Sequence, residues 1–253
     1  MIELGHIHAG YEGRPMLEDV TLRADGGVTC IIGPNGCGKS TLLKVAARLK
    51  KPEAGSLRLS GRPYSDFSPR EFARQLSFLP QIRDTAAATV YQMVMHGRFP
   101  YLGFPRRPGK GDRQIAWQAM VDTGVEAMAD KPLAALSGGE RQKVYLAMML
   151  AQDTPVVLLD EPATYLDIRH QLEILNLMGN MRQRGKTVLA VMHDLNQALE
   201  IADRVCLMDA GRIVALDAPK AVIAGGEIDR VFGVRTRRMA DEAGREYFRF
   251  EKE

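Results

Sequence analysis

The sequence predicts an α/β fold around a mostly parallel β-sheet, and two patterns support this prediction. Short apolar runs at residues 28–32, 156–159, 187–192 and 205–208 are typical of buried strands. Helical stretches precede two of them, and strands that alternate with helices form parallel sheets. A glycine-rich loop at residues 33–40 then separates the first strand from an apolar helical run, which is the strand, loop and helix order of phosphate-binding loops.

The remaining strands are predicted from alternation and turn composition. Apolar and polar residues roughly alternate over residues 2–8, as in a half-buried strand. Residues 209–212 have the composition of a tight turn before an apolar run at 213–216, so we expect a hairpin there. The segment at about 227–253 predicts a short helix and two strands around residues 241–245. It is a C-terminal extension with no recognisable chemistry.

The pattern changes to helices between about residues 86 and 153, which predicts an inserted helical subdomain within one domain spanning 1–253. The candidate helices in it are 90–96, 113–123 and 141–152. Prolines and glycines at residues 105–111 predict a non-helical, solvated loop, with an interaction patch as the alternative, and Asp112 is expected to cap the next helix.

Composition excludes several classes of protein. The chain has 253 residues, of which 45% are hydrophobic and 26% charged, the balance of an ordinary globular protein. A net charge of +3 gives no reason to expect a nucleic-acid partner. We expect neither a secretory signal nor a membrane span, which needs ~20 apolar residues. The three cysteines, at 30, 37 and 206, are not paired in spacing, which favours a reducing cytoplasm.

The glycine-rich loop fits the phosphate-binding pattern G-x-x-x-x-G-K-[ST]. Its residues are Gly33, Pro34, Asn35, Gly36, Cys37, Gly38, Lys39 and Ser40, followed by Thr41. Glycines let successive amide hydrogens wrap a phosphate, and the following helix directs its positive dipole end at the same anion. Lys39 is expected to face the β and γ phosphates, and Ser40 to ligate magnesium. A chance match is disfavoured by the strand and helix on either side.

Two adjacent acids end the strand at residues 156–159. Asp160 is expected to share a magnesium ion with Ser40, because a buried carboxylate needs a partner. Glu161 is expected to face another way, because side chains alternate along a strand, and so to be free to orient or deprotonate a water. An acidic pair at a strand end is more often a solvated turn when it stands alone.

A second helix start with two glycines decides the family resemblance. The pentapeptide is Leu136, Ser137, Gly138, Gly139 and Glu140. It resembles the L-S-G-G-Q signature of ABC ATPases. In that family two subunits pack head to tail, and each signature closes on the ATP held by the other subunit. The sequence departs from the pattern at Glu140, which replaces the commoner glutamine, and at Thr164, where serine is common.

The resemblance extends over nearly the whole chain and implies roles for four more residues. Tyr11 stands where the family stacks an aromatic ring on adenine, and Gln81 resembles the glutamine that contacts magnesium and the membrane subunit. His193 resembles the histidine that contacts the γ phosphate, and Asp167 lies in the motif that crosses the dimer interface. Three of them have ordinary alternatives: Tyr11 as a surface aromatic, Gln81 as a loop amide and His193 as a hydrogen-bonded histidine.

The resemblance implies a P-loop NTPase fold. A RecA-like core with a mostly parallel sheet would carry an antiparallel β lobe and an inserted helical subdomain. It also implies an ATPase with ATP and Mg²⁺, a homodimer, and catalytic roles for Lys39, Gln81, Glu161 and His193. A thiol at Cys37 in the phosphate loop is expected to make hydrolysis sensitive to alkylating reagents, with protection by ATP.

Three stretches, at residues 90–101, 164–171 and 192–198, resemble the ATPases of metal-chelate importers. This implies a subunit at the cytoplasmic face of the inner membrane, held by permease subunits and served by an extracytoplasmic binding protein. Iron-siderophore complexes, haem and cobalamin all remain open as substrates. The alternative is a soluble ABC ATPase that acts on a cytoplasmic protein or nucleic-acid assembly. A nucleotide kinase or GTPase is disfavoured, since no N-K-x-D motif is present.

Overall fold

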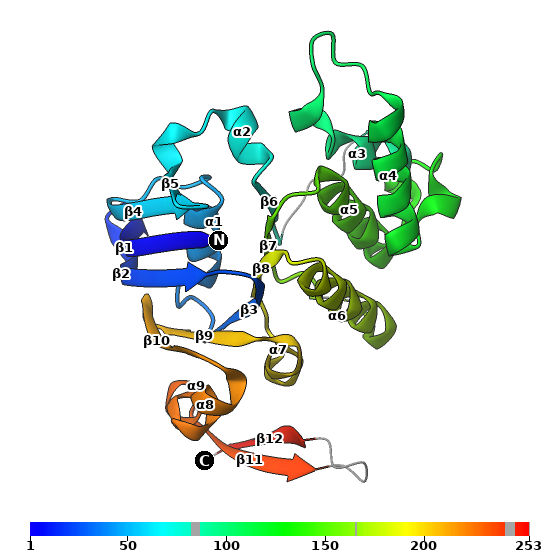
Figure 1. Cartoon of the computed structure of the whole chain (residues 1–253). Helices are drawn as coiled ribbons and strands as arrows, with labels where there is room; N and C mark the ends of the chain where they lie inside the picture. The colour runs from blue at the N-terminus through cyan, green and yellow to red at the C-terminus, as the bar shows by residue number, and fades with distance from the viewer. Residues whose placement is uncertain (82–86, 165, 241–245, 253) are drawn as a thin grey trace.

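The computed structural model describes residues 1–81, 87–164, 166–240 and 246–252, which form three β-sheets and the helices around them (Figure 1). The central sheet has the order β10-β9-β3-β8-β7-β6, and every neighbouring pair is parallel except β10 with β9. Its strands are Arg212–Asp217 (β10), Arg204–Asp209 (β9), Gly27–Ile32 (β3), Thr187–Val191 (β8), Val156–Asp160 (β7) and Leu76–Leu79 (β6). The predicted mostly parallel sheet is confirmed.

The second sheet is antiparallel and has the order β2-β1-β4-β5. Its strands are Arg14–Ala24 (β2), Ile2–Tyr11 (β1), Ala54–Leu59 (β4) and Arg62–Pro63 (β5). The prediction for residues 2–8 was too short, because register shifts between Leu4 and Ile7 and between Ile7 and Ala9 interrupt the alternation. The antiparallel lobe that the family resemblance implied is therefore present.

Helices cover both faces of the central sheet. The α-helices are Lys39–Ala46 (α1), Pro69–Ala73 (α2), Val90–His96 (α3), Lys110–Thr123 (α4), Gly138–Gln152 (α5), Ile168–Gln183 (α6), Leu195–Ile201 (α7), Pro219–Ala224 (α8) and Glu227–Phe232 (α9). Short 3-10 helices lie at Tyr64–Asp66, Phe99–Tyr101, Glu126–Met128 and Leu133–Ala135. No helix in the described part of the chain is long and apolar enough to cross a membrane.

Two hydrophobic cores lie on opposite faces of the central sheet, because alternate residues of each strand point to opposite sides. In β3, Cys30 and Ile32 face the core beneath α3, α5 and α6, whereas Ile31 faces the core shared with α1 and the antiparallel sheet. Figure 1 shows these two groups of elements on either side of the sheet. Loops at the carboxyl ends of β3, β7 and β8 lie between them, where ligands of parallel sheets bind.

The start of α4 corrects an expectation. We predicted a non-helical stretch through Gly111 with Asp112 as the cap in front of the helix. The helix instead begins at Lys110, and the Asp112 side chain accepts a hydrogen bond from the Gly109 amide at 3.0 Å from inside the first turn. Gly109 is the N-cap of this helix, a position where glycine is well tolerated.

The C-terminal segment contains a hairpin of Val234–Ala240 (β11) and Glu246–Lys252 (β12). We expected strands around residues 241–245, which themselves lie outside the described residues. Phe248 and Phe250 of β12 pack against the larger core. The hairpin is therefore attached to the body of the protein next to α8 and α9 (Figure 1).

Candidate functional site

The phosphate-binding loop connects β3 to α1, and the backbone at Met208 and at Met16 packs closely against it. Gly33 has φ of 152°, and a Cβ there would lie 2.2 Å from the Met208 carbonyl oxygen. Gly38 has φ of 105°, and a Cβ there would lie 2.5 Å from the Met16 carbonyl oxygen. Both positions therefore require glycine, since any side chain would be strained and would clash with backbone.

The functional side chains of the loop face charged and polar partners. The Lys39 ammonium donates hydrogen bonds to the carbonyls of Gly33 at 2.7 Å and Pro34 at 2.8 Å. The Ser40 hydroxyl donates to Asp160 Oδ1 at 3.0 Å, across 120 residues of sequence. Asp160 is only 2% exposed, and burial raises its pKa. The loop and the β7 tip thus form one site, as the sequence predicted.

Glu161 leaves the strand in a way that the alternation argument did not anticipate. β7 ends at Asp160, and Glu161 adopts a left-handed φ of 50°, which turns its side chain aside. Its Oε2 accepts hydrogen bonds from Gln81 Nε2 at 2.8 Å and from Thr164 Oγ1 at 3.0 Å. A positive φ in a residue other than glycine costs roughly 1 kcal/mol and is enriched at functional sites.

Glu161 lines two clefts that meet at the carboxyl ends of β7 and β8. The first, of about 140 Å³, is formed by the phosphate loop, its helix and Met16 of β2. The second, of about 240 Å³, is lined by Thr164 and by His193, which is the second residue after the end of β8. The structure therefore brings together the predicted residues Lys39, Ser40, Asp160, Glu161, Gln81 and His193.

The signature pentapeptide forms a capped helix start elsewhere in the chain. Ser137 is the N-cap of α5: its hydroxyl accepts from the Glu140 amide at 3.2 Å, and Glu140 Oε2 accepts from the Ser137 amide at 2.8 Å. The amide of Ser137 is the main reason that the pKa of Glu140 is lowered. No hydrogen bond in the described part of the chain joins this turn to the phosphate loop. The departure at Glu140 completes a capping box, which accepts glutamate as well as glutamine.

Asp167 and Tyr11 lie at two further edges of the molecule. Asp167 is the N-cap of α6, where its carboxylate accepts from the His170 amide at 2.9 Å, and this bond lowers its pKa. Tyr11 ends β1 and is 44% exposed, with the Lys50 ammonium 3.9 Å from the centre of one ring face. The opposite face of the ring remains able to stack on a planar group.

The Cys37 side chain corrects our expectation of a reactive thiol. It is only 5% exposed and belongs to the core between the central sheet and the antiparallel lobe. Burial raises its pKa, although Lys39 acts in the opposite direction. The thiol packs in this core, and Cys37 is not among the residues that line the phosphate-loop cleft, so the basis for rapid alkylation is absent.

Native protein is therefore expected to react at Cys37 with iodoacetamide at least about tenfold more slowly than free cysteine at pH 8, because thiolate formation and access are both reduced. Peptide mass spectrometry after timed quenching gives the rate, and protein unfolded in urea is the control. Cys30 and Cys206 are also buried and serve as internal references. Rapid labelling of Cys37 in the native protein, with loss of turnover, would restore our original expectation.

Two residues near the site were not assigned a role from the sequence. Met16 lines the phosphate-loop cleft from β2, and nothing in its local pattern marks it. Thr164 was noted only as a departure from the family pattern, whereas its hydroxyl in fact holds Glu161. Threonine and serine are equivalent here, because the contact uses only the hydroxyl donor.

These geometries agree with the comparisons. Residues 17–164 match the family model described as ABC transporter. The chain belongs to the ABC transporter family. It is one of the family's ATP-binding subunits, being 42% identical over 229 residues to the ferric enterobactin transport ATP-binding protein FepC of Escherichia coli K12, with 89% of this chain and 84% of FepC covered. It is 40% identical over 245 residues to the hemin import protein HmuV of Gloeobacter violaceus, covering 93% and 88%.

Solved structures support the same fold. A chain of a metal-chelate type ABC transporter in an inward-facing conformation superposes with a TM-score of 0.84 at 23% identity, covering 98% of this chain and 96% of the other. A dimeric ATP-binding cassette in a post-hydrolysis state, with ADP and Pi bound, gives a TM-score of 0.76 at 27% identity, covering 87% and 99%. The predicted ABC ATPase fold is confirmed.

Proposed function

We propose that this ABC ATPase powers the import of ferric siderophores or haem, acting as a homodimer on separate permease subunits. The observation that carries the enzymatic part is the place of Glu161, which lines both the phosphate-loop cleft and the His193 cleft. A carboxylate there can act on a water next to a bound terminal phosphate, while Lys39 supplies positive charge on the other side.

Each residue of the site has a separate task in this proposal. Phosphate oxygens are charged acceptors, so they outcompete the Gly33 and Pro34 carbonyls for the Lys39 ammonium. Glu161 orients or deprotonates the attacking water, and the amide of Gln81 fixes the direction of its carboxylate. His193 contacts the terminal phosphate from the second cleft. Tyr11 stacks on the adenine through the ring face that Lys50 does not cover.

The pair of Ser40 and Asp160 fits a magnesium ion. Both are hard oxygen donors within 3.0 Å of each other, and Asp160 is a buried carboxylate with no cationic partner among the described ion pairs. The described residues hold no cluster of three or more acidic, histidine or cysteine ligands, which suits an ion that keeps waters and phosphate oxygens as ligands. Magnesium would neutralise charge on the phosphates, and Gln81 would complete the set.

The signature turn explains why a dimer is required. Ser137, Gly138, Gly139 and Glu140 form a helix start that suits an anion but lies apart from the phosphate loop of its own chain. In a head-to-tail pair, each signature contacts the ATP of the partner, and Asp167 lies at the interface between them. ATP then favours closure because it binds both subunits only in the closed state.

The substrate class and partners follow from the relatives. FepC is named for ferric enterobactin and HmuV for hemin, so siderophore iron or haem is favoured over cobalamin. We place the subunit at the cytoplasmic face of the membrane, in one domain over 1–253. The helical subdomain at about 86–153 transmits closure to the permease, and an extracytoplasmic binding protein delivers the chelate.

Affinity purification of the tagged chain from detergent-solubilised membranes, followed by mass spectrometry, tests this proposal. We expect a multi-helix permease to remain bound after a salt wash. Its absence, together with recovery of a cytoplasmic protein or nucleic-acid assembly, would support the alternative of a soluble ABC ATPase and leave the ATPase chemistry intact. A Lys39→Ala variant is a useful control, since permease binding should not require ATP hydrolysis.

A further inference from the structure

The first turns of α5 and α6 lie next to each other, and we propose that His170 is a positioning residue that keeps them in register. Through one ring it would fix both the Asp167 loop and the signature turn. This inference rests on the proposed function, because that function assigns both elements to the ATP of the partner subunit. His170 itself touches neither ATP nor the attacking water.

His170 is tied firmly to Asp167. The backbone amide of His170 donates to Asp167 Oδ1 at 2.9 Å, and its ring Nδ1 lies 2.8 Å from Asp167 Oδ2. The amide bond is the main reason that the pKa of Asp167 is lowered. An ionised carboxylate can only accept hydrogen bonds, so this contact requires the tautomer in which Nδ1 is the donor. The side chain of His170 is about a quarter exposed, which limits competition from water.

The other contact of the ring is the signature turn. A methyl group added to Gly139 would meet the His170 ring atoms Cε1 and Nδ1 at 3.5 Å and Cδ2 at 3.6 Å. The ring therefore lies beside Gly139, with room between them for a methyl group but for little more. The Ser137 and Glu140 capping box orders the turn within its own chain segment, and the ring limits how far the turn can move toward α6.

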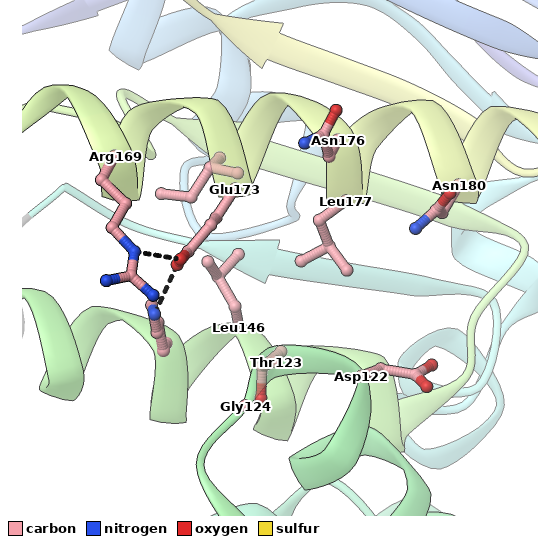
Figure 2. A pocket seen from close by; sticks show the side chains of 11 residues that line it. Asp122, Thr123, Gly124, Leu146, Arg169, Glu173, Asn176, Leu177 and Asn180 are labelled. Atoms are coloured by element: carbon pink, nitrogen blue, oxygen red, sulfur yellow. Dashed lines mark hydrogen bonds and ion pairs between the residues drawn. The ribbon is translucent and has the colours of Figure 1, made fainter.

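One turn further along α6, an ion pair joins the same two helices. Glu173 of α6 pairs with Lys143 of α5. Arg169, one turn earlier on α6, donates from Nε to Glu173 Oε1 at 3.3 Å (Figure 2). The hydrogen bond from Lys143 is the main reason that the pKa of Glu173 is lowered. The Lys143 side chain is 18% exposed, so this contact is partly shielded from solvent.

A cleft of about 380 Å³ begins at this ion pair and lies between α6, the middle of α5 and the end of α4. Figure 2 shows Leu146 and Leu177 on its two sides. Its far end is bridged by Arg184 and Asp122 of α4 at 3.1 Å, where Arg184 is 58% exposed. The ring contact and the ion pair between α5 and α6 therefore lie in their first two turns, next to the signature and Asp167.

The test uses the Glu161→Gln background, in which ATP should hold the closed dimer. Light scattering after size exclusion gives the ATP concentration for half-maximal dimer, and a fluorescent ATP analogue at low protein concentration gives binding to the monomer. We expect His170→Ala to raise the ATP concentration for half-maximal dimer about tenfold. The affinity of the monomer for the ATP analogue should stay within about twofold of the parent value. His170→Asn, whose amide can still donate to Asp167, should recover to within about threefold.

Leu172→Ala is the matched control, because Leu172 is on the same helix and is 53% exposed. If His170→Ala and Leu172→Ala raised the ATP concentration for half-maximal dimer by the same factor, His170 would have only a general structural role. The same would follow if His170→Ala weakened ATP binding by the monomer as much as it weakened dimer formation. Failure of His170→Asn to recover would contradict the Asp167 link. If the Glu161→Gln parent formed no dimer with ATP, the proposed function would be contradicted, and this inference with it. If the parent dimer formed and His170→Ala did not affect it, only the inference would be contradicted.

Discussion

Replacing Glu161 with glutamine is expected to lower the turnover number by about 10²–10⁴-fold, the usual contribution of a general base, while ATP binding persists. Glutamine keeps an acceptor oxygen for Gln81 and Thr164, so the geometry around it should be preserved. It cannot accept a proton from the attacking water. Phosphate release measures turnover, and light scattering should show a dimer that accumulates with ATP.

The matched control is Glu200→Gln, which makes the same change on an exposed residue of α7 and should leave turnover within about twofold. Turnover in Glu161→Gln at more than about a tenth of the wild-type value would show that another group activates the water. His193 would then be the first candidate, since it lines the same cleft.

Replacing Lys39 with alanine is expected to weaken ATP binding by about 10–100-fold, the loss of one charge-assisted hydrogen bond to phosphate. Turnover should fall further, because the same charge stabilises the transferred phosphoryl group. Nucleotide titration by fluorescence gives the affinity, and phosphate release gives the rate. Lys39 is 9% exposed, so the unfolding midpoint must be measured alongside.

Lys39→Met, which retains the length of the side chain without its charge, separates packing from electrostatics. The account predicts that it behaves like Lys39→Ala in ATP binding but is closer to the wild type in stability. Wild-type affinity in the methionine variant would mean that backbone amides of the loop alone hold the phosphates.

Local pattern sufficed for the phosphate site because its chemistry is contiguous in sequence. Lys39 and Ser40 follow a strand directly, and parallel strands end at the same edge of a sheet, so Asp160 and Ser40 were expected to meet. Glu161 was expected to face away from Asp160 because side chains alternate along a strand, and that reason is incomplete. Its direction depends on a left-handed backbone conformation, which a glutamate does not indicate in advance.

Long-range packing explains what could not be predicted. Met16 reaches the cleft only because the antiparallel lobe packs against the phosphate loop, and Cys37 points inward for the same reason. His170 meets Gly139 only through the packing of α6 on α5. The start of α4 is a different case, since Gly111 disfavours a helix by its own propensity, and the Asp112 side chain supports the first turn by accepting from the Gly109 amide.

Iron uptake by cells tests the central claim most directly. Cells that lack the chain are compared with cells that carry it and with cells that carry Lys39→Ala, each supplied with radioactive iron as a ferric siderophore or as haem. We expect that uptake of one of these chelates is lost without the chain, returns with the wild type and does not return with Lys39→Ala. Uptake of both chelates that is the same in all three strains would show that this ATPase does not power their import.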